Sequence, residues 1–255
     1  MKKFIAILIT AAIFTGSLFA QSNEQALEKF KTANDLYSKG KFIEAAELYE
    51  EIVNNDYESY ELYYNLGNAY FKLEEIPSAI LFYERAKKLA PDDEDVNFNL
   101  QIAKLKTVDK IEPVPQFFME EWVDSISELF SLQAWTALGL IFAWLAFTFL
   151  AAFLMIWSPL WKKTFFAAGI ISFVIMAASI FFAYEENTEL TADDSAIVFT
   201  PSVYVKSSPS DEGTNLFILH EGTKVQILDE VGEWQKIRIA DGNVGWLPKE
   251  SVEII

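Results

Sequence analysis

The chain has 255 residues, no cysteine and a formal net charge of −17 at pH 7. Without cysteine it has no disulfide, no thiol nucleophile, no thiolate metal ligand and no thiol for lipid attachment. Its surplus of acidic side chains repels nucleic acid and anionic lipid headgroups. We therefore expect basic proteins or neutral peptides as partners, and no nucleic acid.

Residues 1–20 have the three parts of a secretory signal peptide. Met1-Lys2-Lys3 is basic, residues 4–14 form an apolar run, and a segment of small residues ends in a cleavage site after Ala20. Leu18, the third residue before the cut, is larger than the small residues that usually occupy this position, so an uncleaved anchor is the alternative. In both cases the segment that follows is expected to be exported.

Residues 24–110 are expected to form an all-α tetratricopeptide repeat domain. Segment 60–93 carries the signature of this repeat at the required spacing, in Tyr63, Leu66, Gly67, Tyr70, Ala79 and Tyr83. A shift by the 34-residue repeat length aligns Ala33 with Gly67 and Ala45 with Ala79. A degenerate first copy is therefore expected at about 26–59.

After the second repeat, the acidic run 92–95 is expected to begin a capping helix at 94–108. Acidic side chains favour a helix N-terminus, and the end of a solenoid needs a cover. A calcium site in the same acidic run is the alternative.

Three rows of side chains are expected on the concave face, which the first helix of each repeat lines in proteins with this signature. The 34-residue register gives the rows Phe30, Tyr64 and Phe98, then Asn34 and Asn68, then Tyr37 and Phe71. Aromatic rings contact apolar groups and amides bond to a peptide backbone, so the rows suit an extended peptide. The alternative is that neighbouring helices bury these aromatic side chains.

A connector at 111–131 follows, in which Trp122 and other apolar residues recur at helical spacing against acidic ones. We expect an amphipathic helix, either at the membrane interface or against a protein surface. Two transmembrane helices are then expected at 132–157 and 164–184, because each span has no ionisable residue and is long enough to cross a bilayer.

The link between the spans, residues 158–163, contains Lys162 and Lys163. By the positive-inside rule we expect this link in the cytoplasm and both flanking domains in the periplasm, so the chain is assigned to the bacterial inner membrane. The absence of ionisable residues from the spans argues against transport. Anchoring is the expected role of the hairpin, and helix contacts through its small residues are the alternative.

Residues 192–255 change to short alternating apolar runs separated by turns such as Asp241-Gly242, which predict a small all-β barrel. The sequence of this segment, including Gly232-Glu233-Trp234 and Gly245-Trp246-Leu247-Pro248, resembles that of a bacterial Src homology 3 (SH3) domain. Such domains bind peptides, and some bind cell-wall peptides. Tyr204, Trp234 and Trp246 are the candidate binding residues, although we expect Trp246 mainly to support the small core.

The sequence shows none of three common catalytic patterns. His220 is the only histidine, and it has no neighbouring Ser and Asp pattern typical of a nucleophilic triad. No two acidic residues are marked as a paired acid and base, and no glycine-rich phosphate loop occurs. We therefore expect no enzyme activity, no cofactor and no metal.

Taken in chain order, these parts predict a multidomain membrane protein with a tetratricopeptide solenoid, a two-helix transmembrane hairpin and an SH3-like barrel. With three further stretches, Asn97 to Leu100, Thr107 to Ile111 and Leu219 to Val225, it resembles the BatE-like proteins of bacterial aerotolerance (Bat) operons. The resemblance implies partners among Bat membrane proteins with von Willebrand factor A domains, a MoxR-type ATPase in the cytoplasm, and a role in oxygen or stress tolerance.

The sequence therefore predicts a non-enzymatic scaffold that binds partner proteins or peptides on the periplasmic side. A cell-wall anchor that binds peptidoglycan through the barrel is the first alternative. The second is a structural membrane protein that supports the assembly of a larger complex.

Overall fold

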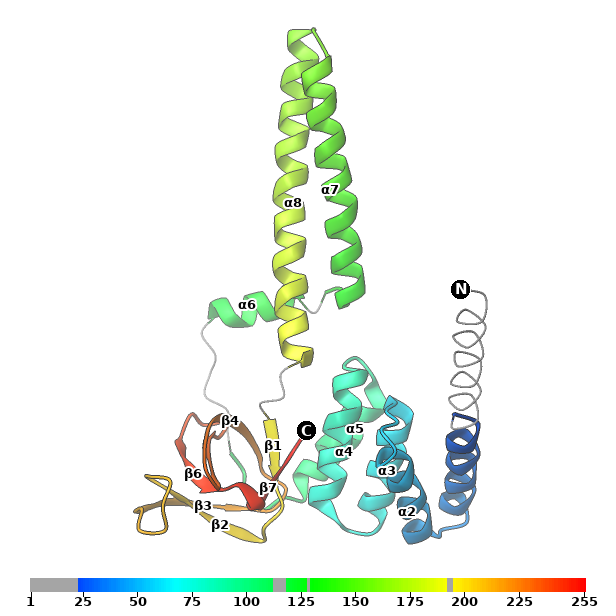
Figure 1. Ribbon diagram of the computed structural model, residues 1–255, viewed down its shortest axis with the longest axis vertical. Helices are drawn as coiled ribbons and strands as arrows, with labels where there is room; N and C mark the ends of the chain where they lie inside the picture. The colour runs from blue at the N-terminus through cyan, green and yellow to red at the C-terminus, as the bar shows by residue number, and fades with distance from the viewer. Residues whose placement is uncertain (1–22, 112–117, 128, 192–194) are drawn as a thin grey trace, which may run out of the picture. The chain divides into compact units, whose positions relative to one another are not determined.

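The computed structural model describes residues 23–111, 118–127, 129–191 and 195–255 (Figure 1). The signal peptide expected at 1–20 lies outside the described residues. The chain divides into two compact units. The first combines Met1–Pro113 with Asp193–Ile255, and the second is Val114–Ala192. The repeats and the barrel therefore share one unit, although the second unit separates them in the sequence.

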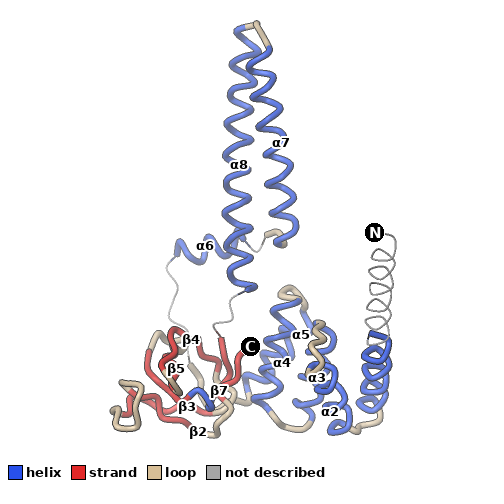
Figure 2. The backbone as a smooth tube through the Cα atoms, viewed as in Figure 1, coloured by secondary structure: helices blue, strands red, loops and turns tan. Residues whose placement is uncertain are grey.

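The repeat region consists of five helical segments, shown as coils in Figure 1 and in blue in Figure 2. They are residues 23–38, α2 Phe42–Val53, α3 Tyr60–Lys72, α4 Ile76–Leu89 and α5 Glu94–Leu105. Each expected repeat thus holds one helix pair. The Asp93 carboxylate accepts a hydrogen bond from the Val96 amide, which explains why the acidic run starts α5.

Small residues bring the helices of each pair together. Ala33, Ala45 and Ala79 are fully buried. A Cβ atom added at Gly67 would lie 2.7 Å from Cδ1 of Tyr83, so the glycine is needed for the close approach of α3 to α4.

The barrel is a seven-stranded antiparallel sheet in the order β3-β2-β6-β5-β4-β1-β7. Alternate inward residues, including Val203, Val205 and Leu247, form its core. The strands are β1 Ser195–Val198, β2 Ser202–Lys206, β3 Asn215–His220, β4 Lys224–Val231, β5 Trp234–Arg238, β6 Val244–Pro248 and β7 Val252–Ile254.

Two glycines allow backbone arrangements in the barrel that a side chain would prevent. Gly242 has φ +86° in the turn between β5 and β6, where an L side chain would be strained. A Cβ atom at Gly245 would lie 2.4 Å from Cγ1 of Val205, so β6 approaches β2 only because no side chain is present there.

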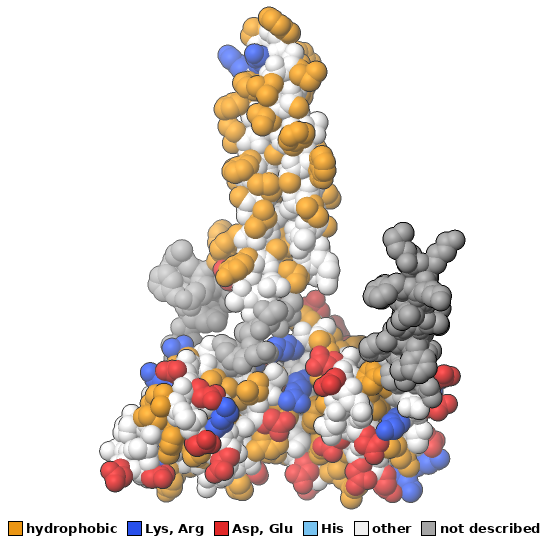
Figure 3. Space-filling model, viewed as in Figure 1, with side chains coloured by type: hydrophobic (Ala, Val, Ile, Leu, Met, Phe, Trp, Pro, Cys, Tyr) orange, Lys and Arg blue, Asp and Glu red, His pale blue; other side chains and the backbone are white. Residues whose placement is uncertain are grey.

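The second unit contains α6 Phe118–Ser127, α7 Leu132–Met155 and α8 Pro159–Thr191. Both α7 and α8 are long and apolar enough to cross a membrane. Hydrophobic side chains cover the two helices in Figure 3. Inside the pair, the Trp135 and Phe182 rings stack with centroids 5.0 Å apart.

The hairpin differs from the prediction at its turn and at its far end. Helix α8 begins at Pro159, so Lys162 and Lys163 lie in its first turns and not in a link at 158–163. Proline suits the first turn of a helix because its missing N–H has no intrahelical partner there. Helix α8 also continues past 184 to Thr191, because Glu185 and Glu186 are good helix formers even though they end the apolar span.

Candidate protein-binding sites

The concave side of the repeats holds a pocket of about 290 Å³. The first helices of successive repeats supply most of its lining: Tyr37, Tyr64, Asn68, Phe71, Lys72, Tyr83, Asn99 and Ile102. Four predicted site residues are therefore brought together, namely Tyr37, Tyr64, Asn68 and Phe71. Phe30 and Asn34 are not in this lining, and the Phe30 ring packs against Tyr49 with centroids 5.8 Å apart.

The two predicted asparagines belong to a repeated hydrogen-bond pattern. Oδ1 of Asn34 accepts from the Tyr49 hydroxyl at 2.5 Å and from Nδ2 of Asn65 at 3.1 Å. One repeat later, Oδ1 of Asn68 accepts from the Tyr83 hydroxyl at 2.7 Å and from Nδ2 of Asn99 at 2.9 Å. Both lone pairs of each amide oxygen are thus engaged.

The asparagines were expected to bond to a peptide backbone through their amides, and this hydrogen-bond pattern leaves only the N–H groups for that role. Their oxygens hold the helices together, so the amide N–H groups are what Asn68 can offer to a peptide. Asn65 and Asn99 were not among the predicted residues. The 34-residue register that relates Tyr64 to Phe98 also relates Asn65 to Asn99, and this was the signal available in the sequence.

Burial keeps the tyrosines of this pattern protonated. It raises the pKa of Tyr49 to about 12, with a smaller contribution from Tyr37. Burial also raises the pKa of Tyr83, with smaller contributions from Tyr64 and Tyr37. Both hydroxyls therefore remain hydrogen-bond donors well above neutral pH.

The predicted barrel residues share the outer face of the sheet. Tyr204 is 52% exposed and pairs with Ile218 across the strands. Trp234 and Trp246 are half-buried. Nζ of Lys206 lies 5.6 Å from the Trp234 ring centre, and Nζ of Lys236 lies 6.0 Å from that of Trp246. Trp246 belongs neither to the cluster of buried core residues nor to the side chains packed against it, so the expected role of Trp246 in the core is not supported.

The barrel and the repeats are joined by an ion-pair cluster around a buried carboxylate, which the sequence did not predict. Glu84 of α4 is 6% exposed. Its Oε1 lies 2.6 Å from Nζ of Lys104 on α5, and its Oε2 lies 2.9 Å from Nζ of Lys224 on β4. Burial alone would raise the pKa of Glu84, but the two lysines outweigh it and lower that pKa. The carboxylate is therefore ionised at neutral pH.

Asp109 forms a second polar contact across the same junction. Its carboxylate accepts from the His220 amide at 2.7 Å and from the Thr223 hydroxyl at 2.7 Å, and it lies 2.7 Å from Nδ1 of His220. Desolvation raises the pKa of Asp109, but these hydrogen bonds outweigh it and lower that pKa. Asp109 and His220 are far apart in the chain, so nothing in their local sequence paired them.

Apolar contacts complete the junction. Ile197 of β1 is fully buried in the core cluster of the repeats, and Phe199 and Ile255 pack against the same cluster. Gly222 has φ +82°, and a Cβ atom there would lie 2.8 Å from Cγ2 of Thr107. This turn of the barrel therefore fits against the repeats only as glycine.

These arrangements define the class of protein: tetratricopeptide repeats and a C-terminal SH3 domain in one folded unit, with two long apolar helices between them in the sequence. Residues 30–94 match the tetratricopeptide repeat family, and residues 201–253 match the bacterial SH3 domain family. No curated protein matches the chain. The repeats imply protein partners. Among the residues that the structure describes, no three or more His, Cys, Asp or Glu side chains form a cluster suited to a metal.

Proposed function

We propose that this protein is a non-enzymatic, membrane-anchored scaffold whose repeat groove binds segments of partner proteins in the periplasm. The observation that carries the proposal is the concave pocket, whose lining combines the aromatic side chains of Tyr37, Tyr64 and Phe71 with the amide of Asn68. Apolar surfaces with a few fixed polar groups are typical of ligand-binding sites.

The topology of the chain supports the placement of both domains on one side of the membrane. The repeats and the barrel pack into one unit, and two apolar helices of membrane-spanning length lie between them in the sequence. Two crossings return the chain to its starting side. Lys162 and Lys163 lie near the turn of this hairpin and favour the cytoplasm, which supports a periplasmic location for the folded unit.

The resemblance to BatE-like proteins extends the proposal to a Bat-type complex linked to oxygen or stress tolerance. The partners would be Bat membrane proteins with von Willebrand factor A domains. The MoxR-type ATPase of such a system would act from the cytoplasm, because the tip of the hairpin is the part of this chain assigned to that side.

Crosslinking in cells tests the scaffold. The full chain would be crosslinked, purified in detergent and analysed by mass spectrometry beside a double variant, Tyr37→Ala with Phe71→Ala. A matched control, Leu27→Ala with Leu89→Ala, removes two exposed apolar side chains of the repeats outside the pocket lining. We expect a defined set of membrane proteins with the full chain and the control, and its loss from the groove variant. Equal recovery from all three would contradict the groove as the binding site.

A second candidate function is peptidoglycan binding through the barrel. Tyr204, Trp234 and Trp246 on one outer face favour it, because aromatic side chains supply contact area for a wall peptide or glycan. The full chain in detergent should then sediment with purified peptidoglycan, and Trp234→Ala should reduce the bound fraction. Sedimentation that is absent, or unchanged by Trp234→Ala, would exclude this use of the face.

A further inference from the structure

The groove continues beyond the pocket onto α5. In the 34-residue register, Phe98, Ile102 and Leu105 occupy the places of Tyr64, Asn68 and Phe71. Phe98 is 63% exposed and Leu105 is 70% exposed. Helix α5 therefore acts as the first helix of an incomplete third repeat, and its part of the groove is apolar and uncovered. The expectation that Phe98 might be buried by neighbouring helices is wrong.

The polar groups of this groove include amide donors and two lysines. The oxygen of Asn68 is already engaged by Tyr83 and Asn99, which leaves its N–H groups for a ligand. Lys72 lines the pocket, and Nζ of Lys106 lies 4.9 Å from the centre of the Phe71 ring. One positive charge therefore lines the pocket, and a second lies over an aromatic ring of the same lining.

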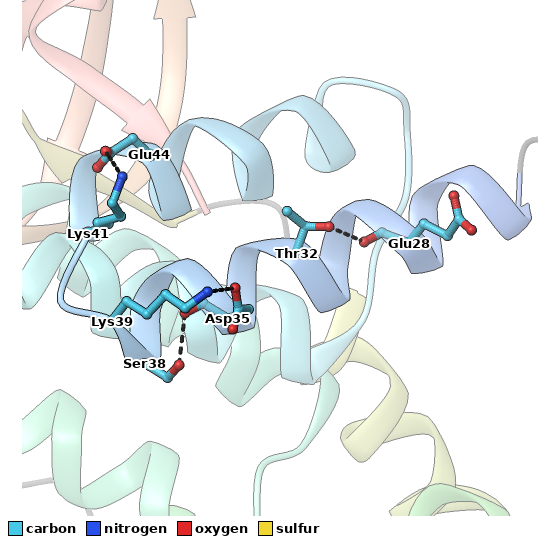
Figure 4. Close-up of polar contacts among 7 residues, drawn as sticks. All are labelled: Glu28, Thr32, Asp35, Ser38, Lys39, Lys41 and Glu44. Carbon is cyan, nitrogen blue, oxygen red and sulfur yellow. Dashed lines mark hydrogen bonds and ion pairs between the residues drawn. The ribbon is translucent and has the colours of Figure 1, made fainter.

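Two other lysines of the repeats are held in local ion pairs, unlike these two. Lys39 pairs with Asp35 at 2.5 Å and Lys41 with Glu44 at 3.1 Å, and both pairs are local contacts on exposed helix surfaces (Figure 4). Lys72 and Lys106 form no ion pair with any residue that the structure describes. Their charges are available to a partner at the groove.

We propose that the groove binds an acidic segment of a partner protein that also carries aromatic or aliphatic side chains. Its carboxylates would meet Lys72, Lys106 and the amide of Asn68, and its apolar side chains would cover Phe71, Phe98 and Leu105. This inference rests on the proposed function and names the chemistry of its partner. It reverses, for this surface, the preference for basic or neutral partners that the net charge of the whole chain suggests.

Selection from a library of random twelve-residue peptides displayed on phage tests the inference, with the full chain in detergent as the target. The charge-reversed variant is Lys72→Glu with Lys106→Glu. A matched control, Lys87→Glu with Lys249→Glu, makes the same change in net charge outside the pocket lining. Thermal unfolding of all three proteins in detergent checks that each is folded.

The wild type and the control should enrich peptides that combine Asp or Glu with aromatic or aliphatic residues. The charge-reversed variant should enrich peptides with Lys or Arg. A synthetic acidic peptide taken from the selection should bind the charge-reversed variant at least about tenfold more weakly than the wild type, and its affinity for the wild type should fall as salt is raised.

Three outcomes overturn the inference and are distinguishable from one another. If the wild type enriches neutral or basic peptides whose binding is lost in the Tyr37→Ala, Phe71→Ala variant, the groove binds partners but not acidic ones. If no enriched peptide depends on the groove residues, both the inference and the proposed groove function fail. Selections that do not change on charge reversal also exclude Lys72 and Lys106 as the recognition groups.

Discussion

At the scale of single residues, the junction between repeats and barrel depends on carboxylates held by groups from both parts. Glu84 is buried between a lysine of α5 and a lysine of β4. Asp109 receives hydrogen bonds from the His220 amide and the Thr223 hydroxyl. A buried charge is tolerated only when it is paired, so both sites select the docked arrangement of the two parts.

Lys224→Ala tests the ion-pair cluster. Removal of one partner from a buried charge destabilises by roughly 3–5 kcal/mol when nothing replaces it. Lys104 remains, so we expect a loss of about 2 kcal/mol in the free energy of unfolding. Lys249→Ala is the control, because Lys249 pairs with Glu230 at an exposed site, where such pairs contribute about 0–1 kcal/mol. Urea unfolding of the full chain in detergent measures both, and equal losses would contradict a special role of the cluster.

Asp109→Asn tests the second contact through its pH dependence. The folded pKa of Asp109 is lowered, so its stabilisation is fully present above about pH 4, the ordinary pKa of Asp, and is lost as pH falls through the folded pKa. We expect Asp109→Asn to cost about 2 kcal/mol at pH 7 and less at pH 3. Urea midpoints at these two values, on either side of the sequence pI of 4.4, measure the difference. A cost that is independent of pH would show that the charge of Asp109 is unimportant.

At the scale of elements, local sequence predicted most of what is found. The repeat signature located the helix pairs, and alternating apolar residues located the strands. The ends of the hairpin were less predictable, because hydropathy reports the apolar span and not the helix. Proline at the start of α8 and two glutamates near its end extend the helix beyond that span.

Gly67→Ala tests the close contact between α3 and α4. Alanine favours a helix over glycine by about 1 kcal/mol, but its Cβ would overlap the Tyr83 ring, and overpacking costs roughly 1–3 kcal/mol. We therefore expect a net loss of stability. In a Tyr83→Leu background the ring is absent, so the same substitution should become neutral or stabilising. The two pairs of thermal unfolding curves decide this, and a loss of the same size in both backgrounds would contradict the proposed overlap.

At the scale of the whole molecule, one folded unit is assembled from two distant stretches of chain. The candidate site residues on each stretch were predictable, because repeat register and strand alternation are local patterns. The partners of Glu84, Asp109 and Ile197 were not, since they come from the other stretch and no local periodicity relates them. The positive charge of the groove was also missed, because the net charge sums over the whole chain and hides a local cluster of lysines.

Replacement of residues 114–192 by a flexible Gly/Ser linker should give a water-soluble chain in which repeats and barrel still dock. Of the seven tryptophans only Trp234 and Trp246 remain, so fluorescence reports the barrel while circular dichroism at 222 nm reports the helices. A shared core predicts coincident unfolding curves. Two separate transitions would show that the domains are independent. The Lys224→Ala substitution should lower both curves together.

The burial of Ile197 in the core of the repeats also has a consequence for biogenesis. A ribosome makes the repeats first, then the two apolar helices, and last the strand that fills that core. During this interval the apolar surface destined for Ile197 and Phe199 has no cover, which is the condition under which nascent chains aggregate. On the proposed topology, the protein completes its fold outside the cytoplasm only after its hairpin has entered the bilayer, so membrane insertion precedes folding and sets its timing.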